Sequence, residues 1–342
     1  MAQQASSSPV WSIVLAAGEG SRLGSITVDA AGRHVPKQFC SLLGGDTLLQ
    51  DAIARASCVS APDRLCAVVA ADHREWWQHM DLGIPEANLL CQPCNRGTAN
   101  GLLFALSAIL RRDPEARVVV LPSDHHIHKE AVFRQALRSA AEAACQPGAP
   151  VVMLGIEPEF ADPELGYILP TTTAGGNDEA APVSGFFEKP SRPRAQELIA
   201  HGALWNAFVL AAPAASLLRL FLRRMSGHVR GFATLGEWLT DPAALASYYA
   251  TLDTRDFSRD VVPGNEAMLR VRRVPSCGWS DLGTPGRLVR VLRRRPRSTG
   301  GGRPVFVDLS SRVASAHRGW FPLSRDAGSP SAANAAGALR AM

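Results

Sequence analysis

The sequence predicts an α/β fold in which a mixed, mostly parallel β-sheet carries helices on both faces. Short β-branched runs at residues 10–16, 65–70 and 116–122 have the composition of buried strands. Apolar residues recur at helical spacing over residues 48–56, 102–110 and 133–144. Strands that alternate with helices in this way are typical of a parallel sheet covered by helices. The same spacing assigns the apolar helical positions to the core.

The second half of the chain departs from this alternation. A further strand is expected within residues 149–156, and a polar segment rich in Gly and Thr at 171–182 separates two β-like runs, which predicts a hairpin. We therefore expect α+β insertions on the same sheet. Residues 1–10 are expected to be a flexible N-terminus, and residues 298–342, which are rich in small and polar side chains, a mobile tail.

The composition favours a cytoplasmic protein with reduced thiols and no membrane partner. The 342-residue chain has no signal-peptide pattern and no apolar run long enough to span a bilayer. Its seven cysteines are scattered, and because no second pair completes a zinc ribbon, we interpret Cys91 and Cys94 as structural. Neighbouring residues of an extended chain point in opposite directions, so His125, His126 and His128 are interpreted as structural or as outer contacts of a ligand.

The formal net charge of +5 is modest and unevenly distributed. Arginines gather at residues 270–274 and 290–297, but no aromatic residues are interleaved with them and no nucleic-acid motif is present. A solvated helix end, or a field that attracts an anionic substrate, explains these clusters better than nucleic-acid binding. No nucleic-acid partner is therefore expected.

A glycine-rich loop follows the first predicted strand. Gly18 and Gly20 let backbone N–H groups approach an anion closely, so the loop favours a phosphate ligand. A dinucleotide fingerprint would need glycine where Leu23 stands, and a Walker loop would need Gly-Lys-Ser/Thr. The loop leads instead to Arg22, and Lys37 follows fifteen residues later in the string PKQF.

Further strings follow this loop in a fixed order. They are NRGTANG (95–101), LPSDHHI (121–127), GYI (166–168), FFEKP (186–190), LWNAFVL (204–210) and GWSDLGTP (278–285). With LAAGEGSRL and PKQF, they resemble the signature of the sugar-1-phosphate nucleotidyltransferases, and PKQF leans toward the mannose-1-phosphate guanylyltransferases. The resemblance spans roughly residues 11–293. It implies a Rossmann-like fold of the nucleotide-diphospho-sugar transferase, GT-A-like type.

The implied catalytic domain covers residues 11–297, of which 11–150 mainly bind nucleotide and 151–297 mainly bind sugar phosphate. The implied reaction is attack of a sugar 1-phosphate oxygen on the α-phosphorus of a nucleoside triphosphate, which releases pyrophosphate. GTP and mannose 1-phosphate, or a related hexose or heptose 1-phosphate, are the favoured substrates. The nucleophile is already an anion, so alignment and charge neutralisation are expected to matter more than a general base.

Arg22 and Lys37 are the implied catalytic cations. A fixed guanidinium at Arg22 would hold the departing pyrophosphate through two oxygens. Lys37 matches the family lysine that balances charge near the reacting phosphates. The alternatives are a surface arginine at the first position and an exposed lysine before a core phenylalanine at the second.

Two aspartates match the metal ligands of the family. Asp124 follows the strand predicted at 116–122, at the edge where open α/β sheets bind ligands. Asp281, in GWSDLGT, matches the second ligand. Carboxylate oxygens suit Mg²⁺, which often bridges substrate phosphates, so the resemblance implies one Mg²⁺ held by both aspartates. A helix or turn cap is the alternative for each, and Asp260 is a rival metal ligand.

The remaining family positions form two groups. The implied nucleotide-binding positions are Leu15, Ala16, Ala17, Gly18, Gly20, Ser21, Arg96, Thr98 and Asn100. The implied sugar-phosphate-binding positions are Gly166, Tyr167, Glu188, Lys189 and Asn206. In the family pair that Glu188 and Lys189 match, the acid accepts hydrogen bonds from sugar hydroxyls and the lysine meets the sugar phosphate. A surface salt bridge is the alternative for this pair.

The sequence departs from the guanylyltransferase pattern in two places. GSITVDAAGRHV replaces a run rich in Trp, Pro, Leu and Ser, and Ala207 and Phe208 replace a small polar residue and a glycine of the usual WNSGMF string. The second change should narrow or dry the sugar pocket, so nucleotidyl transfer is better supported than mannose. The alternatives are a uridylyl-, thymidylyl- or adenylyltransferase for another sugar 1-phosphate, and a catalytically silent relative that binds nucleotide sugar. A homodimer is also left open.

Overall fold

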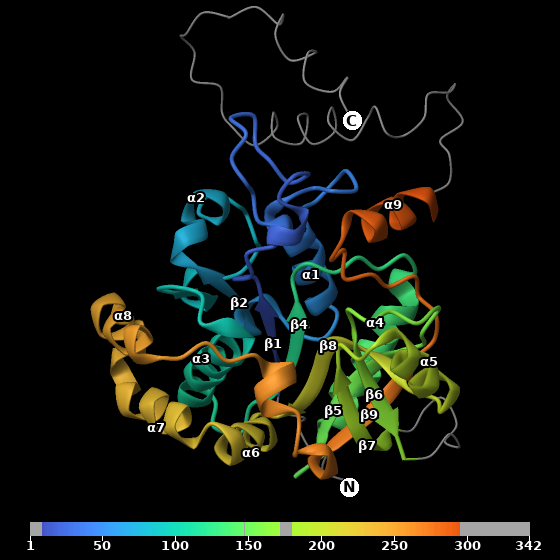
Figure 1. Ribbon diagram of the computed structural model, residues 1–342. Helices are drawn as coiled ribbons and strands as arrows, with labels where there is room; N and C mark the ends of the chain where they lie inside the picture. The colour runs from blue at the N-terminus through green and yellow to red at the C-terminus, as the bar shows by residue number, and fades with distance from the viewer. Residues whose placement is uncertain (1–8, 147, 172–179, 295–342) are drawn as a thin grey trace, which may run out of the picture.

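The computed structural model describes residues 9–146, 148–171 and 180–294, which build one nine-stranded sheet (Figure 1). Its strands are β1 (Val10–Leu15), β2 (Leu65–Ala70), β3 (Leu89–Gln92), β4 (Arg117–Pro122), β5 (Val151–Ile156), β6 (Gly166–Pro170), β7 (Ala181–Glu188), β8 (Leu204–Pro213) and β9 (Leu269–Val274). The predicted strands and the predicted fold class are confirmed. The tail predicted at 298–342, residues 1–8 and most of the predicted hairpin loop lie outside the described residues.

The strand order is β3-β2-β1-β4-β8-β5-β9-β7-β6, and β8 also pairs with β6. The strands of the first half, β1 to β4, pair with one another in parallel. Antiparallel pairings predominate in the second half, where β8 lies between β4 and β5 and where β6 and β7 form the predicted hairpin. Both halves of the chain therefore contribute to one sheet, and β1 and β4 end at the same edge.

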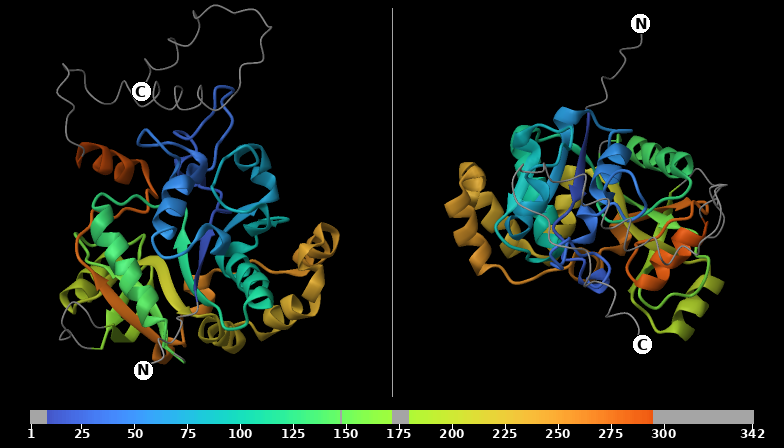
Figure 2. Two further views of the ribbon diagram at one scale, coloured as in Figure 1. Left: turned by 180° about the vertical axis from the view of Figure 1, so that it is seen from behind. Right: turned by 90° about the horizontal axis from the view of Figure 1, so that it is seen from above.

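Helices cover both faces of this sheet (Figure 2). They are α1 (Leu48–Ala56), α2 (Arg74–Trp77), α3 (Gly97–Arg112), α4 (Glu130–Ala143), α5 (Arg192–Ala200), α6 (Ala214–Arg224), α7 (Ser226–Leu235), α8 (Pro242–Thr251) and α9 (Pro285–Arg294). Side chains of α1, α4, α5 and α9 pack in one core cluster, and those of α3, α6, α7 and α8 pack in the other. Among the residues that the structure describes, no helix has the length and apolar character needed to cross a membrane.

The local sequence explains where α1 begins and which face it buries. Thr47 and Gln50 form a capping box, in which each side chain bonds to the backbone N–H of the other. Leu49, Ala52 and Ala56 are fully buried, as the predicted helical spacing requires. Full burial of a leucine side chain stabilises the fold by about 1.5–3 kcal/mol, so this apolar face holds α1 on the sheet.

The two arginine clusters fall on different kinds of element. The arginines at 270–274 lie on the strand β9 and not at a helix end. Leu269 and Val271 of this strand face the core, and the arginines between and after them are only partly buried. The described part of the second cluster lies on α9, whose one face is buried through Leu288 and Val291 and whose other face carries arginines. Only the second cluster therefore fits the predicted helix end.

Candidate active site

The glycine loop lies at the carboxyl end of β1. Gly20 has a left-handed backbone (φ 63°), and a Cβ there would lie 3.0 Å from the backbone nitrogen of Lys37. The buried Gln38 amide donates hydrogen bonds to the carbonyls of Ala16 and Gly18, at 3.0 and 2.7 Å. The same loop and its flanks carry Leu15, Ala17 and Ser21. Gly20 thus permits close packing inside the protein, whereas Gly18 is exposed and has no neighbour within 4 Å of a Cβ.

Lys37 joins the two predicted metal-binding aspartates. Its side chain is only 7% exposed, and its ammonium lies 3.1 Å from the Asp124 carboxylate. The same ammonium donates a hydrogen bond to the backbone carbonyl of Asp281 at 2.5 Å. The chain segments that carry Asp124 and Asp281 lie side by side, because His126 and Ser280 form an antiparallel bridge between them. Three predicted residues from distant parts of the sequence therefore meet at one place.

The protein surroundings favour the ionised form of Asp124. Burial alone would raise the pKa of this carboxyl, but the neighbouring positive charges, that of Lys37 foremost, and the hydrogen bonds to the carboxylate together outweigh burial and lower the pKa. Burial lowers the pKa of the adjacent His125 to about 4, so its imidazole is neutral at pH 7. The indole of Trp279 donates to Nδ1 of His125 at 3.2 Å, which leaves the proton on Nε2, 3.7 Å from Asp124.

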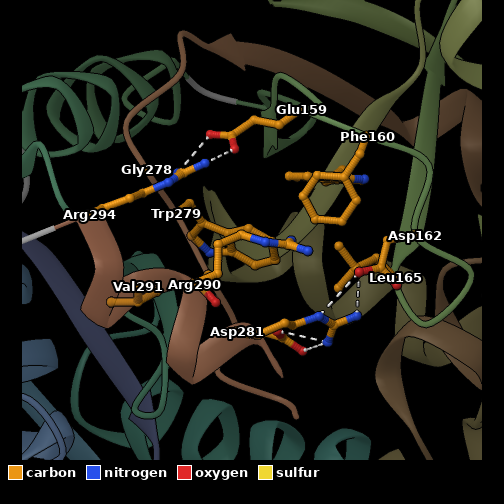
Figure 3. A pocket seen from close by; sticks show the side chains of 13 residues that line it. Glu159, Phe160, Asp162, Leu165, Gly278, Trp279, Asp281, Arg290, Val291 and Arg294 are labelled. Atoms are coloured by element: carbon orange, nitrogen blue, oxygen red, sulfur yellow. Dashed lines mark hydrogen bonds and ion pairs between the residues drawn. The ribbon is translucent and has the colours of Figure 1, made fainter. Parts of the chain in front are cut away.

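The carboxylate of Asp281 is engaged by Arg287 of α9. One guanidinium nitrogen lies 2.9 and 2.7 Å from the two Asp281 oxygens. The other side of the guanidinium lies 2.7 Å from Asp162, and Figure 3 shows both carboxylates with dashed lines to it. The backbone nitrogen of Gly283 also donates to Asp281 at 3.1 Å. Asp281 therefore already has a cationic partner from its own chain.

Arg22 lies across from this group with its side chain largely free. The side chain is 54% exposed, and its sole ion pair among the described residues is with the exposed Glu164, at 3.5 Å. A Cβ on Gly283 would lie 3.0 Å from the Arg22 guanidinium, so Arg22 borders the Asp281 loop. Exposed ion pairs contribute little to stability, and the guanidinium can exchange this partner for a phosphate at small cost.

Arg96, Thr98 and Asn100, which were predicted to bind the nucleotide, form hydrogen bonds to other residues of the protein. The Arg96 guanidinium donates to a backbone carbonyl of α8 at 3.2 Å. The buried Asn100 amide donates to the backbone carbonyls of Arg96 and Asp253, at 2.7 and 3.0 Å. Thr98 donates to the Asp256 carboxylate at 3.1 Å. These bonds hold residues 253–256 against the start of α3, and the part of the three side chains in nucleotide binding stays a prediction.

The predicted sugar-side residues come together at β6, β7 and β8. A Cβ on Gly166 would lie 2.8 Å from a Glu188 carboxylate oxygen and 3.3 Å from the Asn206 Cβ, so only glycine fits between them. The Lys189 ammonium lies 4.0 Å from Glu188. Burial and the nearby negative charge of Asp256 raise the pKa of Glu188. The cluster thus presents an acid, a cation and an amide around a close backbone approach.

Two predicted residues make bonds that serve the fold. The Tyr167 side chain is completely buried, and its hydroxyl bonds to the backbone of Asp162 and accepts from the indole of Trp205. The Tyr167 side chain is therefore not available to a sugar. The Asp260 carboxylate accepts from the backbone nitrogen of Asp256 at 2.6 Å, within a π-helical turn at Phe257–Val261. This hydrogen bond gives Asp260 a structural role, which is an alternative to its predicted role as a rival metal ligand.

Residues with a strained backbone lie at or next to the predicted site residues. Among the described residues, three that are not glycine have a left-handed backbone: Lys189 (φ 49°), Phe208 (φ 52°) and Leu282 (φ 47°). Each is a predicted site residue or lies within two positions of one. Such a conformation costs about 1–3 kcal/mol and persists where the surroundings enforce it, often at functional sites. Phe208 is further held by an edge-to-face contact with Phe257, at 5.7 Å between ring centres.

The donor set of this site fits a magnesium ion. In the described parts of the chain, no group of three or more His, Cys, Asp or Glu side chains is arranged to hold a metal. Asp124 and Asp281 supply carboxylate oxygens alone, and Mg²⁺ usually takes one or two carboxylates and fills its other positions with water and substrate phosphates. Two carboxylates beside the glycine loop meet that pattern, with Lys37 and Arg287 as their present partners.

A comparison with protein-family models identifies this arrangement. Residues 11–295 match the family described as "Nucleotidyl transferase". The chain belongs to the nucleotidyl transferase family. This match confirms the family expected from the ordered strings and covers all of the elements that build the site.

Individual relatives of this nucleotidyl transferase chain agree with that assignment. The "Mannose-1-phosphate guanylyltransferase 2" of Escherichia coli O157:H7 is 33% identical over 59% of the chain and 42% of the relative. The "Alginate biosynthesis protein AlgA" of Pseudomonas aeruginosa is 30% identical over 80% of the chain and 56% of the relative. A crystal structure of a mannose-1-phosphate geranyltransferase from Thermus thermophilus superposes with a TM-score of 0.72 and 31% identity, over 84% of this chain and 81% of that one.

The nucleotidyl transferase chain spans about half the length of the curated relatives that it matches. The fold class is confirmed by the Thermus thermophilus structure. A Helicobacter pylori structure described as a mannose-6-phosphate isomerase, with a TM-score of 0.59 and 20% identity, shares the fold alone.

Sequence reasoning missed several residues of the nucleotidyl transferase site. Gln38 stands inside PKQF, so its place in a recognised string was a usable signal. Arg287 stands two positions after GWSDLGTP and was open to the same reasoning, but the arginines that follow it, at 290–297, were interpreted as a solvated helix end or a field that attracts an anionic substrate. Asp162 and Glu164 stand in a stretch without a recognised string, and only the fold brings them to Arg287.

Proposed function

We propose that this protein transfers GMP from GTP to a sugar 1-phosphate, with mannose 1-phosphate the favoured acceptor, to give a GDP-sugar and pyrophosphate. A phosphate oxygen of the sugar 1-phosphate forms a bond to the α-phosphorus, and the bond between the α- and β-phosphates breaks. The observation that carries the proposal is the contact of the Lys37 ammonium with the Asp124 carboxylate and with the backbone carbonyl of Asp281, beside the glycine loop. A buried cation held by one carboxylate and a backbone carbonyl suits a reaction in which negative charge moves between phosphates.

The residues of the site divide this work between them. Lys37 is fixed by its bonds and would offset charge at the reacting phosphate, and the exposed Arg22 would hold the departing pyrophosphate. Glu188 and Lys189 would receive the sugar hydroxyls and the sugar phosphate. Asp124 and Asp281 would hold Mg²⁺, which when bound supplies Lewis-acid stabilisation of the phosphate oxygens. No residue is required as a general base, since the attacking phosphate is already ionised.

Two observations bear on the identity of the sugar acceptor. The relatives named for mannose 1-phosphate favour that sugar. Phe208, however, stands with a left-handed backbone two residues from Asn206, and its ring takes space that a glycine would leave open. An acceptor with a smaller or less polar group on that side would fit such a wall. The test must therefore offer several sugars.

The experiment combines each of GTP, UTP, dTTP and ATP with a panel of hexose and heptose 1-phosphates in the presence of Mg²⁺. Pyrophosphate release is measured for each pair with the full chain. We expect the fastest release with GTP and mannose 1-phosphate or a closely related sugar. Release with another triphosphate alone would replace guanylyl transfer by that activity. Absence of release from every pair would refute nucleotidyl transfer and favour a catalytically silent binding protein.

A further inference from the structure

Arg287 places a buried positive charge directly on the carboxylate of Asp281. Its side chain is 9% exposed, and one nitrogen reaches both Asp281 oxygens, at 2.9 and 2.7 Å. The remaining nitrogens face Asp162, at 3.2 and 2.7 Å. The two oxygens that would ligate a divalent cation are therefore engaged by a group whose charge is permanent.

We propose that Arg287 is a positioning residue that occupies Asp281 as an internal cation and competes with the divalent metal for this carboxylate. The inference rests on the proposed function, in which Asp124 and Asp281 share the metal. Two cations on one carboxylate repel each other strongly in a partly buried site, so Asp281 can serve the guanidinium or the metal fully, but not both. Arg287 thereby lowers the affinity of the free protein for metal and holds Asp281 in place beforehand.

The structure provides a second partner for Arg287 when it leaves Asp281. Asp162 is 11% exposed and is itself fixed, because its backbone bonds to the buried Tyr167 hydroxyl. Glu164 lies 3.5 Å from the same guanidinium. A buried arginine without a carboxylate would be costly. With Asp162 and Glu164 on its other side, Arg287 can release Asp281 and remain paired.

Glu164 links this exchange to the triphosphate site. One of its carboxylate oxygens lies 3.5 Å from Arg287 and 3.5 Å from Arg22. A phosphate that binds Arg22 draws that arginine away from Glu164, and Glu164 then pairs more fully with Arg287. Nucleotide phosphates at Arg22 should thus help Arg287 to release Asp281, and by linkage metal at Asp281 should strengthen nucleotide binding.

Arg287 could instead serve only to fix α9 to the fold, and the same helix supplies the control. Arg290 lies one turn further along α9, with its guanidinium 4.1 Å from the ring centre of Phe160. Arg294 pairs with Glu159. Both arginines attach α9 to the loop between β5 and β6, as Arg287 does, but neither contacts Asp281. Arg290→Gln therefore reproduces a loss of helix attachment without freeing the carboxylate.

The test measures binding of Mn²⁺ alone to the full chain, by electron paramagnetic resonance of the unbound ion, without nucleotide. The proteins are the wild type, Arg287→Gln, Arg290→Gln and the double variant Asp281→Asn/Arg287→Gln. We expect Arg287→Gln to bind Mn²⁺ about tenfold more tightly than the wild type, a change that corresponds to the loss of one competing ion pair. Arg290→Gln should bind as the wild type does, and the double variant should lose the gain.

Equal or weaker Mn²⁺ binding by a folded Arg287→Gln overturns the inference, as does an equal gain in Arg290→Gln. If Arg287→Gln does not fold, Asp162→Asn takes its place: removal of the second partner binds Arg287 more firmly to Asp281, so Mn²⁺ affinity should fall, and an unchanged affinity overturns the inference. Pyrophosphate release by the wild type is measured separately. Active wild type with no gain in Arg287→Gln rejects the role of Arg287 alone, whereas absent pyrophosphate release rejects the proposed function.

Discussion

Gly18 and Gly20 stand two residues apart in one loop, yet alanine should affect them in opposite ways. Gly20 has a left-handed backbone, and an alanine Cβ would lie 3.0 Å from the backbone nitrogen and 3.2 Å from the Cγ of Lys37. The conformation costs about 1–2 kcal/mol and the crowding about 1–3 kcal/mol, so Gly20→Ala should destabilise the protein by about 2–5 kcal/mol. Gly18 has an ordinary φ and open space, and alanine there should change stability by less than about 1 kcal/mol.

Activity should separate the two variants as clearly as stability does. If the open space over Gly18 receives the triphosphate, a methyl group there should raise the KM for the nucleotide about tenfold, the loss of one good phosphate contact. The melting temperature of a domain of this size falls by roughly 2–4 °C per kcal/mol, so Gly20→Ala should melt at least roughly 4 °C below the wild type. Gly18→Ala should have the same melting temperature as the wild type.

Calorimetry and steady-state pyrophosphate release over a range of triphosphate concentrations test both halves of this argument. The phosphate-binding assignment of the loop is refuted if Gly18→Ala keeps the KM of the wild type. The structural account of Gly20 is refuted if its alanine variant melts with the wild type, because Lys37 would then have room that the structure does not give it.

Three further outcomes follow from the site. Asp124→Asn and Asp281→Asn should each lower kcat by about two orders of magnitude or more while the circular dichroism spectrum is kept; near-normal turnover in either would remove that residue from the metal site. Lys37→Met should lower the free energy of unfolding, measured in urea, by about 2 kcal/mol. This is less than the loss of about 3–5 kcal/mol when a fully buried ion pair is broken, because Asp124 is 33% exposed; an unchanged urea midpoint would contradict the contact between Lys37 and Asp124. Glu188→Gln should raise the melting temperature at pH 7, since the raised pKa of Glu188 means that the folded protein loses stability as pH rises through it. This gain should vanish below about pH 4, where the unfolded carboxyl is also protonated, and a gain independent of pH would contradict the pKa shift.

Local patterns were sufficient for most of the elements that carry the site. The β-branched runs of β1 and β4 and the helical spacing of α1 depend on burial of neighbouring residues, which sequence spacing records directly. β3 was missed, because three of its four residues are only partly buried, the fourth is the polar Gln92, and the strand lies at the sheet edge. The antiparallel insertion of β8 between β4 and β5 was also beyond local reasoning. It depends on which edges remain free after the parallel part forms.

Residues of the candidate site could be predicted where they stand in a sequence string that resembles a family motif with a known role. Arg22, Lys37, Asp124 and Asp281 all stand in such strings, and the structure brings the last three into one group. The partner of Asp281 could not be obtained in this way. Arg287 was one of many arginines near the end of the chain, and the packing of α9 against the β5–β6 loop decides which of them is buried.

The separation of buried from exposed arginines also bears on how the site stays stable without substrate. Lys37 and Arg287 are nearly buried; Lys37 pairs with Asp124, and Arg287 pairs with Asp281 and Asp162, whereas Arg22 is exposed and only weakly paired. A cluster of unpaired buried carboxylates would be destabilising, so the two buried cations stabilise the adjacent segments that carry Asp124 and Asp281 in the free protein. The exposed arginine is then the cation that a phosphate can reach first. The order in which charges are exchanged at this site would therefore follow from burial, with Arg22 first and Arg287 later.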